Sequence, residues 1–487
     1  MTTGVQHQPN RSALDRYFHI SERGSTVGSE IRAGVVTFFA MAYIVILNPL
    51  IIGTTPDVDG NVLGIPQVAA ATALAAGVMT IAFGLIARYP FGIAAGLGLN
   101  TLVAVTLVAS EGLTWPEAMG LVVLDGIVIV LLAVSGFRTA VFRAIPPSMK
   151  AAMGVGIGMF IAMIGLVDAG FVRRIPDAAG TTVPVGLGID GSISSWPTVT
   201  FVLGLIICGA MVVRRVRGGL FIGIVATTVI AMIVEALTGS GPSFEDGQPN
   251  PGGWSLAVPV IPESFGGLPD LSIVGAVDIV GAFTRIGVLA ASLLVFTLVL
   301  ANFFDAMGTM TALGKQGNLV NEDGVLPDMK KALVVEGFGA IVGGATSSSS
   351  ATVYADSSAG VADGARTGLA NIVTGVLFLL AMFLTPLYEV VPIEAAAPVL
   401  VIVGALMIAQ IVDIEWTQFH IALPAFLTIV VMPFTYSIAN GIGVGFIAFS
   451  LMAVAAGKAK EVHWIMWLVS ALFVVYFGMD PILAALG

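Results

Sequence analysis

The sequence is poor in charge. Only 10% of its 487 residues are Asp, Glu, Lys or Arg, whereas 57% are hydrophobic. A water-soluble domain carries about 25% charged residues, so this chain cannot cover itself with a polar surface. Many apolar runs approach the roughly 20 residues that cross the bilayer core. The composition therefore excludes an ordinary soluble domain and predicts an all-α polytopic membrane protein.

Cysteine and histidine are also scarce, with one Cys and four His in the chain. The single Cys208 excludes a disulfide within the chain. No Cys/His spacing suggests a metal site, so we expect no metal. No nucleophile–base motif, phosphate-binding loop or dinucleotide fingerprint occurs, which argues against an enzyme and against a cofactor. Without an ATP site, pumping would have to use an ion gradient. Without a basic stripe, we expect no nucleic acid partner.

The apolar segments fall into two sets, with thirteen to fifteen expected spans in total. The expected domains are a leader (1–32), a first transmembrane repeat (33–238), a polar connecting region (239–285) and a second transmembrane repeat (286–487). The polar leader lacks the short apolar core of a cleaved signal peptide. Basic residues follow alternate spans, whereas the intervening loops are acidic. This asymmetry predicts a multi-pass protein of the cell inner (plasma) membrane with a cytoplasmic N-terminus.

The two halves share a weak internal repeat. Pro146 precedes Gly158 at the same spacing at which Pro392 precedes Gly404. A Gly- or Ser-rich break lies upstream of each, at 91–100 and 347–360. Interrupted hydrophobic segments in corresponding positions are the best sequence indication of a transporter's binding site.

A few polar side chains stand inside the apolar runs. A charge there costs at least about 2.5–3.5 kcal/mol, so such residues are candidates for function. Asp305 has Asn302 three residues before it, which places both on one helix face. This face could line a substrate cavity or supply a hydrogen bond between helices. Asp125, beside Gly126, could be functional or could mark a packing contact. Glu336 is a weaker candidate because lysines lie near it.

The two breaks read as extended chain that enters a helix. Asp356 follows four serines and Tyr354, and a helix is expected from about Ser357. Non-helical backbone at membrane depth is tolerated only where protein buries it or where it lines a cavity. The free N–H groups of a half-helix can then bind a polar ligand. Gly98 and Asn100 lie in the matching break. The alternatives are a surface loop for the serines and a helix cap for Asn100.

Long motifs occur in order along nearly the whole chain. They include GLGLN at 96–100, AIPPSMKAAMGVGIGMFIAMIGL at 144–166, FFDAMGT at 303–309 and TVYADSSAGVADGARTGL at 352–369. Together they resemble the nucleobase–ascorbate transporter superfamily, in particular its AzgA-like adenine/guanine/hypoxanthine permease branch. The resemblance implies about fourteen transmembrane segments as a 7+7 inverted repeat, with core and gate domains. It also implies short strands that lead into half-helices in segments 3 and 10.

The resemblance carries roles to particular positions. Gly98 and Asn100 match the binding motif of the third segment, and Asp305 matches an acid linked to proton coupling in the eighth. Two positions depart from the branch. Asn302 stands where an aspartate is usual, and Asp356 stands in the tenth segment where a glutamate is usual. Asn302 cannot ionise, and Asp356 is one methylene shorter.

The sequence thus predicts a secondary active transporter that imports a purine nucleobase by proton symport. The expected substrate-binding residues are Gly98, Asn100, Asn302, Tyr354, Ala355 and Asp356, and the expected proton-coupling residues are Asp305 and Asp356. One alternative keeps the fold but carries xanthine, uracil or an anion, and another is a channel. The expected partners are the base, a proton and membrane lipid, and a homodimer is left open.

Overall fold

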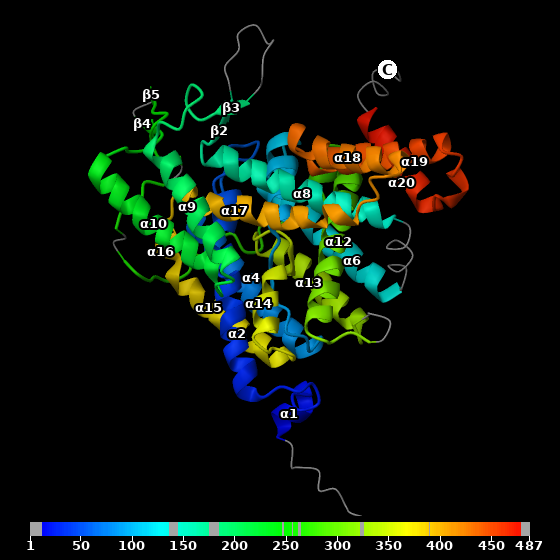
Figure 1. The fold of residues 1–487 in the computed structure, drawn as a ribbon, viewed down its shortest axis with the longest axis horizontal. Coiled ribbons are helices and arrows are strands. Elements are labelled where there is room, and N and C mark those ends of the chain that lie inside the picture. Colours follow the sequence, from blue (N-terminus) through cyan, green and yellow to red (C-terminus); the bar gives the residue numbers. More distant parts are fainter. Residues whose placement is uncertain are drawn as a thin grey trace, which may run out of the picture.

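The computed structural model describes residues 12–135, 145–174, 185–245, 248–255, 257–261, 264–321, 326–388 and 390–478. Residues 1–11 of the expected leader and the last nine residues of the second repeat lie outside this part. The described chain is mostly helical (Figure 1). Within it, eight helices are long and apolar enough to cross a membrane, and five shorter apolar helices accompany them. The chain is therefore a multi-pass membrane protein.

The first half contains most of these helices and three of the short strands. Its elements are α1 (Ala13–Phe18), α2 (Val27–Met41), α3 (Ile44–Ile52), α4 (Ile65–Ile86), β1 (Ile93–Ala95), α5 (Leu97–Thr101), η1 (Leu102–Ser110), α6 (Trp115–Ser135), α8 (Pro147–Asp168), β2 (Val172–Arg174), β3 (Val185–Leu187), α9 (Trp196–Val213) and α10 (Gly219–Thr238).

The second half starts with a short strand pair and continues with helices. Its elements are β4 (Phe244–Glu245), β5 (Gln248–Pro249), α11 (Gly281–Arg285), α12 (Val288–Gln316), α13 (Met329–Ala345), β6 (Ala351–Val353), η2 (Ala355–Ser357), α14 (Ser358–Ala362), α15 (Gly368–Ala381), η3 (Met382–Leu384), α16 (Thr385–Tyr388), α17 (Ile393–Ile408), η4 (Ala409–Asp413), α18 (Phe419–Phe434), α19 (Ile438–Ala455), η5 (Ala459–Glu461) and α20 (Trp464–Phe477).

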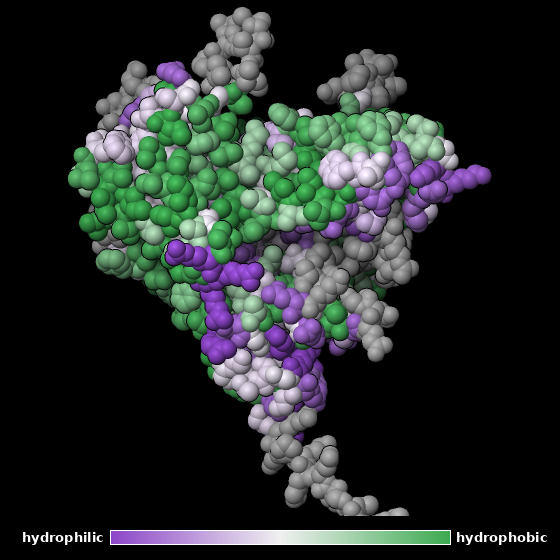
Figure 2. All heavy atoms as spheres, viewed as in Figure 1, coloured by the Kyte–Doolittle hydropathy of each residue, from purple (hydrophilic) through white to green (hydrophobic). Residues whose placement is uncertain are grey.

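The helices α9 and α10 turn an apolar stripe outward. On α10 the exposed residues Ile222, Val225, Val229 and Ile233 recur at helical spacing along one face. Figure 2 shows this part of the molecule, on the left, covered by hydrophobic residues, whereas hydrophilic residues gather below it, toward α1. A soluble monomer does not expose a patch of this kind, so the stripe fits lipid contact.

Two short strands from opposite halves of the chain pair in the interior. β1 and β6 run antiparallel, with Ile93 opposite Val353 and Ala95 opposite Ala351. The ladder continues at one end, where the Gly96 N–H donates to the Ser350 carbonyl at 3.0 Å. Every residue of both strands is buried. Each strand thus satisfies the other's backbone where water is absent. The prediction that the two breaks are extended and enter helices is confirmed by β1 with α5 and by β6 with η2 and α14.

The long helices pack in matching pairs. α4 lies against α15, α6 against α13 and α8 against α17, while α9 packs on α10 and α18 on α19. The contact between α8 and α17 is close because it is made by glycines of the repeat. A Cβ built on Gly404 would lie 2.4 Å from the Gly158 carbonyl oxygen. Small residues let membrane helices approach in this way.

At the end of the molecule nearest α1, the buried carboxylate of Asp363 forms ion pairs that connect three elements. The Asp363 side chain is 2% exposed and follows α14. Its Oδ2 accepts from Arg32 Nε of α2 at 2.7 Å. Its Oδ1 pairs with Arg217, which lies between α9 and α10. Asp363 therefore joins the elements around the strands to the α9–α10 pair.

Candidate functional site

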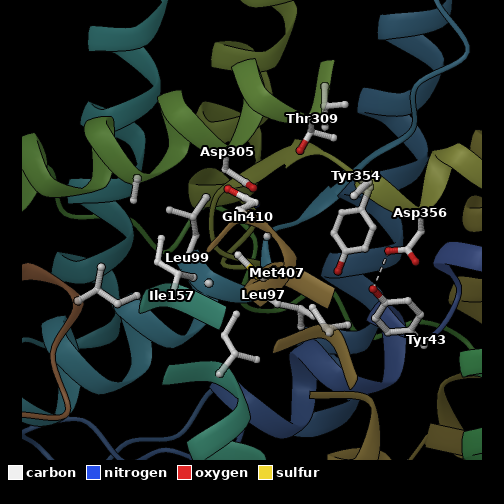
Figure 3. A pocket seen from close by; sticks show the side chains of 18 residues that line it. Tyr43, Leu97, Leu99, Ile157, Asp305, Thr309, Tyr354, Asp356, Met407 and Gln410 are labelled. Carbon is white, nitrogen blue, oxygen red and sulfur yellow. Dashed lines mark hydrogen bonds between the residues drawn. The ribbon is translucent and has the colours of Figure 1, made fainter. Parts of the chain in front are cut away.

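A cavity of about 170 Å³ lies where the two strands end. Its wall comes from α5 and η2 with the end of β6, from α8 and α12, from the turn between α2 and α3, and from α17, η4 and the start of α19. Figure 3 shows the labelled side chains pointing into it: Tyr43, Leu97, Leu99, Ile157, Asp305, Thr309, Tyr354, Asp356, Met407 and Gln410. Segments far apart in the sequence thus meet at one point.

Asp356 is held in a fixed position on one side of the cavity. It stands in η2, directly after β6, and its Oδ2 accepts a hydrogen bond from the Tyr43 hydroxyl at 2.8 Å (Figure 3). Tyr43 reaches it because it occupies the turn that separates α2 from α3. The ring of Tyr354 lies 6.1 Å from that of Tyr43. A carboxylate accepts several hydrogen bonds, so Asp356 can still accept from a ligand.

The opposite side of the cavity is the start of α5. Gly96, Leu97, Gly98 and Leu99 line it. The first amide groups of a helix have no acceptor one turn earlier, so the N–H groups of Leu97, Gly98 and Leu99 are available to a ligand, whereas that of Gly96 donates to Ser350. Gly98 also lets α5 approach α8, because a Cβ on it would lie 2.9 Å from Ile157 Cγ2. The site therefore combines backbone donors with a close helix contact.

The remaining polar groups sit on α12 and η4. Asp305 and Thr309 lie one turn apart on α12, and Gln410 lies in η4. The other residues contributed by α8 and α17 are apolar, among them Ile157 and Met407. Among the described residues that line this cavity there are two carboxylates and no Lys, Arg or His. Its chemistry favours a ligand that donates hydrogen bonds and has apolar faces.

A wider polar vestibule of about 580 Å³ continues from this cavity. The two spaces share Asp305, Thr309 and Gln410. The vestibule adds Lys150 from the first turn of α8 and Gln316 from the end of α12. It extends the cavity in one direction.

Five of the seven residues predicted for the site line the cavity: Gly98, Asp305, Tyr354, Ala355 and Asp356. The structure places the other two, Asn100 and Asn302, outside the lining of this cavity. Asn100 is fully buried on another face of α5, and neither of its amide atoms has a hydrogen-bond partner among the described residues. Helical rotation turns Leu97, Gly98 and Leu99 toward the cavity and Asn100 away from it.

Asn302 faces α6 instead of the cavity. Its Nδ2 donates to Asp125 Oδ2 at 3.0 Å and to Ser350 Oγ at 2.9 Å. It shares a broad face with Asp305, but it lies one turn earlier, where α12 packs on α6. Asp125 is thus partnered across the bundle, and the neighbouring Gly126 packs on the backbone of α13.

Tyr43 and Gln410 line the cavity but were not predicted from the sequence. An aromatic residue in an apolar span normally reads as core, and nothing local links Tyr43 to Asp356. Gln410 stands at the end of an apolar run, and its polar amide in that position was the signal that could have identified it as a site residue. Thr309, one turn after Asp305, is a further lining residue that the sequence did not single out.

The sequence of the chain matches known proteins over most of its length. The sequence model of the Permease family (Xan_ur_permease) matches residues 28–444. The chain is 38% identical over 473 residues to the guanine/hypoxanthine permease PbuG of Bacillus subtilis (strain 168), covering 95% of this chain and 99% of that protein. It is 34% identical over 461 residues to the adenine permease AdeQ of Escherichia coli (strain K12), covering 94% and 95%.

A solved structure shares the fold. The transmembrane domain of a cyanobacterium bicarbonate transporter, BicA, matches with a TM-score of 0.60 over 85% of this chain and 97% of that chain. The two are 15% identical in sequence, so the likeness concerns the fold alone.

Proposed function

This chain belongs to the Permease family, and from that premise we propose that it is a secondary transporter that imports guanine, hypoxanthine or adenine by proton symport. Its relatives are permeases and not enzymes. The observation that carries the proposal is the cavity between the two half-helices. There a carboxylate held by a tyrosine faces backbone N–H groups across apolar walls.

A purine base fits the chemistry of this cavity. Its flat faces suit apolar side chains such as Leu97, Ile157 and Met407. Its N–H groups can donate to Asp356, and guanine offers two adjacent donors to one carboxylate. Its carbonyl or ring-nitrogen acceptors can face the first amides of α5. Gln410, with both a donor and an acceptor, can meet either kind of edge. Asn100 and Asn302 act in this proposal as buried supports.

The composition of the cavity disfavours the anion alternative. The BicA likeness alone leaves that alternative open, because fold does not fix cargo. An anion here would meet Asp305 and Asp356, with no basic side chain among the described lining residues. Like charges brought together in a poorly solvated site repel strongly. Xanthine and uracil remain the competing cargoes and are separated by competition.

Asp305 is the proposed proton-linked acid of the cavity. It lies where the cavity meets the vestibule, so it can exchange protons with water on that side. The vestibule begins at α8 and the end of α12, near basic residues whose distribution favours a cytoplasmic N-terminus. In this proposal the protein resides in the inner membrane and faces the cytoplasm in the described conformation.

The proposed architecture is a 7+7 inverted repeat of fourteen segments. The paired packing of α4 with α15 and of α6 with α13 supports it, as does the Gly158–Gly404 contact of α8 with α17. In this division α2 to α6 and α12 to α15 form a core domain. α8 to α10 and α17 to α19 form the gate domain, and α20 follows as an extra helix.

The direct test is uptake of radiolabelled guanine, hypoxanthine and adenine in a bacterial strain that lacks its own purine transporters. We expect uptake of at least one base, competed by unlabelled guanine, hypoxanthine or adenine and not by xanthine, uracil or bicarbonate. A protonophore should abolish accumulation. Uptake competed only by an anion would contradict the purine assignment, and accumulation that survives the protonophore would contradict symport.

The site itself is tested with Asp356→Asn, which keeps the shape and removes the charge. We expect guanine uptake to fall at least tenfold while the protein still reaches the membrane. Glu111→Gln is the matched control, because this carboxylate also accepts from a tyrosine, Tyr476 at 2.9 Å, but lies outside the cavity. Equal uptake by Asp356→Asn and wild type would remove Asp356 from the site.

A further inference from the structure

A second polar cluster lies behind the cavity wall. It consists of Asp125 on α6, Asn302 on α12 and Ser350 immediately before β6, all fully buried. Asn302 Nδ2 donates to Asp125 Oδ2 at 3.0 Å and to Ser350 Oγ at 2.9 Å. None of the three lines the cavity. The cluster is therefore separate from the proposed base site.

The cluster has fewer hydrogen-bond donors than its buried acceptor oxygens require. Asp125 Oδ1 and Asn302 Oδ1 are both buried and have no hydrogen-bond partner among the described residues. Both atoms are acceptors if the carboxyl group is ionised. Burying an ionised carboxylate without compensation is strongly unfavourable. One proton on Asp125 Oδ1 neutralises the charge and supplies a donor. A neutral acid pairs with a primary amide through two hydrogen bonds, and the amide-to-acid bond is already present here.

No neighbouring charged group among the described residues neutralises Asp125 in place of that proton. On α12 the nearest acid is Asp305, one turn further along, and on α13 it is Glu336, whose Oε1 accepts from Thr352 Oγ1 at 3.4 Å. Glu117, at the start of α6, pairs with Arg285 of α11 at 2.7 Å. No ion pair among the described residues joins Asp125 to a basic side chain. The described residues also hold no cluster of three metal-ligating His, Cys, Asp or Glu.

We propose that Asp125 binds a proton at Oδ1, supported by Asn302, and that this site is loaded and unloaded in each transport cycle. The inference rests on the proposed proton symport and adds a coupling group outside the cavity. The step makes and breaks a single O–H bond. The proton enters from the outer side and leaves to the cytoplasm, and no other bond changes.

The cluster is connected to both halves of the base site. Asn302 lies three residues before Asp305 on α12. Ser350 precedes β6, which leads to Asp356, and its carbonyl accepts from Gly96 at the start of α5 at 3.0 Å. Loss of the proton leaves a buried charge that draws on the donors of Asn302 and Ser350. The protonation state of Asp125 therefore acts on the backbone that presents the base site.

The test uses the full chain, purified and reconstituted in proteoliposomes with labelled guanine, or with whichever purine the uptake assay selects. Asp125→Asn removes the titratable group and keeps an amide pair with Asn302. An imposed gradient of one pH unit can support roughly tenfold accumulation per coupled proton. We expect accumulation by Asp125→Asn to fall by about tenfold, the share of one coupled proton at this gradient, while exchange of labelled for unlabelled base stays within about twofold of wild type. Ser450→Ala, which removes a buried hydroxyl paired with Ser470 at 2.8 Å outside the cluster and the cavity, should still accumulate.

The outcomes separate this inference from the proposed function. Failure of the wild-type protein to accumulate base on a pH gradient overturns the symport, and the inference with it. Accumulation by Asp125→Asn equal to wild type overturns the inference alone. If a sodium gradient at equal pH drives accumulation of base by the wild type, the cluster is assigned to Na⁺. That result overturns the proposal that it binds a proton. If Asp125→Asn fails to exchange base, infrared spectroscopy of the unmodified protein decides. A protonated-carboxyl band that vanishes at high pH and shifts on base addition supports the proposal, and its absence overturns it.

Discussion

At the residue scale, the contact that sets the site is the bond between Tyr43 and Asp356. Tyr43→Phe removes the 2.8 Å hydrogen bond and leaves the ring in place. A hydrogen bond to a charged group is worth about 1.5–3 kcal/mol. Because the carboxylate then loses its fixed direction, we expect roughly a tenfold or greater rise in the KM of base uptake.

The matched control is Tyr17→Phe. The Tyr17 hydroxyl donates to the Leu85 carbonyl at 3.0 Å, on an exposed surface away from the cavity. This variant should transport as wild type does. A Tyr43→Phe protein with an unchanged KM would show that Asp356 does not need this support.

Gly98 is a second residue with a measurable role. A methyl group there would lie 2.9 Å from Ile157 Cγ2, so Gly98→Ala should push α5 from α8 and narrow the cavity. We expect a severalfold loss of transport, measured as uptake per mole of membrane protein. Ile157→Ala should restore part of it in the double variant. Gly28→Ala is the control, since nothing lies within 4 Å of its Cβ position.

The sequence allowed most helices to be predicted, because hydropathy alone reports which segments enter lipid. It also predicted β1 and β6, because serines and glycines in an apolar chain do not form a lipid-facing helix. It failed where a side chain's direction mattered. The three-residue spacing of Asn302 and Asp305 correctly gave a common face, but it could not show that α6 covers one end of that face. Tyr43 was hidden because its partner lies in the other half of the chain.

At the element scale, the proposed core and gate predict which helices move against each other. Ala94→Cys with Thr352→Cys joins directly opposed residues of β1 and β6, in a Cys208→Ala background. Opposed residues in an antiparallel pair lie within disulfide range. Both strands belong to the proposed core, so this crosslink should leave transport intact.

Gly98→Cys with Ile157→Cys joins α5 to α8, which belong to different proposed domains. Oxidation should block transport, and a reductant should restore it, as measured by uptake before and after treatment. The reduced protein is the control for the substitutions themselves. Full transport by the oxidised pair would mean that α5 and α8 move as one body.

At the scale of the whole molecule, Asp363 joins the proposed core to the proposed gate through Arg217. The Arg217 side chain is 59% exposed, and ion pairs of this kind are worth about 0–1 kcal/mol. Arg217→Gln, which breaks this pair and leaves the Arg32–Asp363 pair in place, should therefore change the balance of conformations by no more than about fivefold. The expected readout is a faster or slower turnover with a nearly unchanged KM. Asp328→Asn, which breaks a surface pair with Lys331, is the control. A complete loss of folding would contradict this reading.

The β1–β6 pair also bears on how the protein is made. The ribosome delivers β1 early, but the strand that completes its hydrogen bonds arrives only in the second half of the chain. Until then, the nascent first half holds unpaired peptide groups at membrane depth, which lipid cannot solvate. The two halves of the gene product should consequently depend on each other for assembly. A first half expressed alone should be degraded, and co-expression with the second half should rescue it.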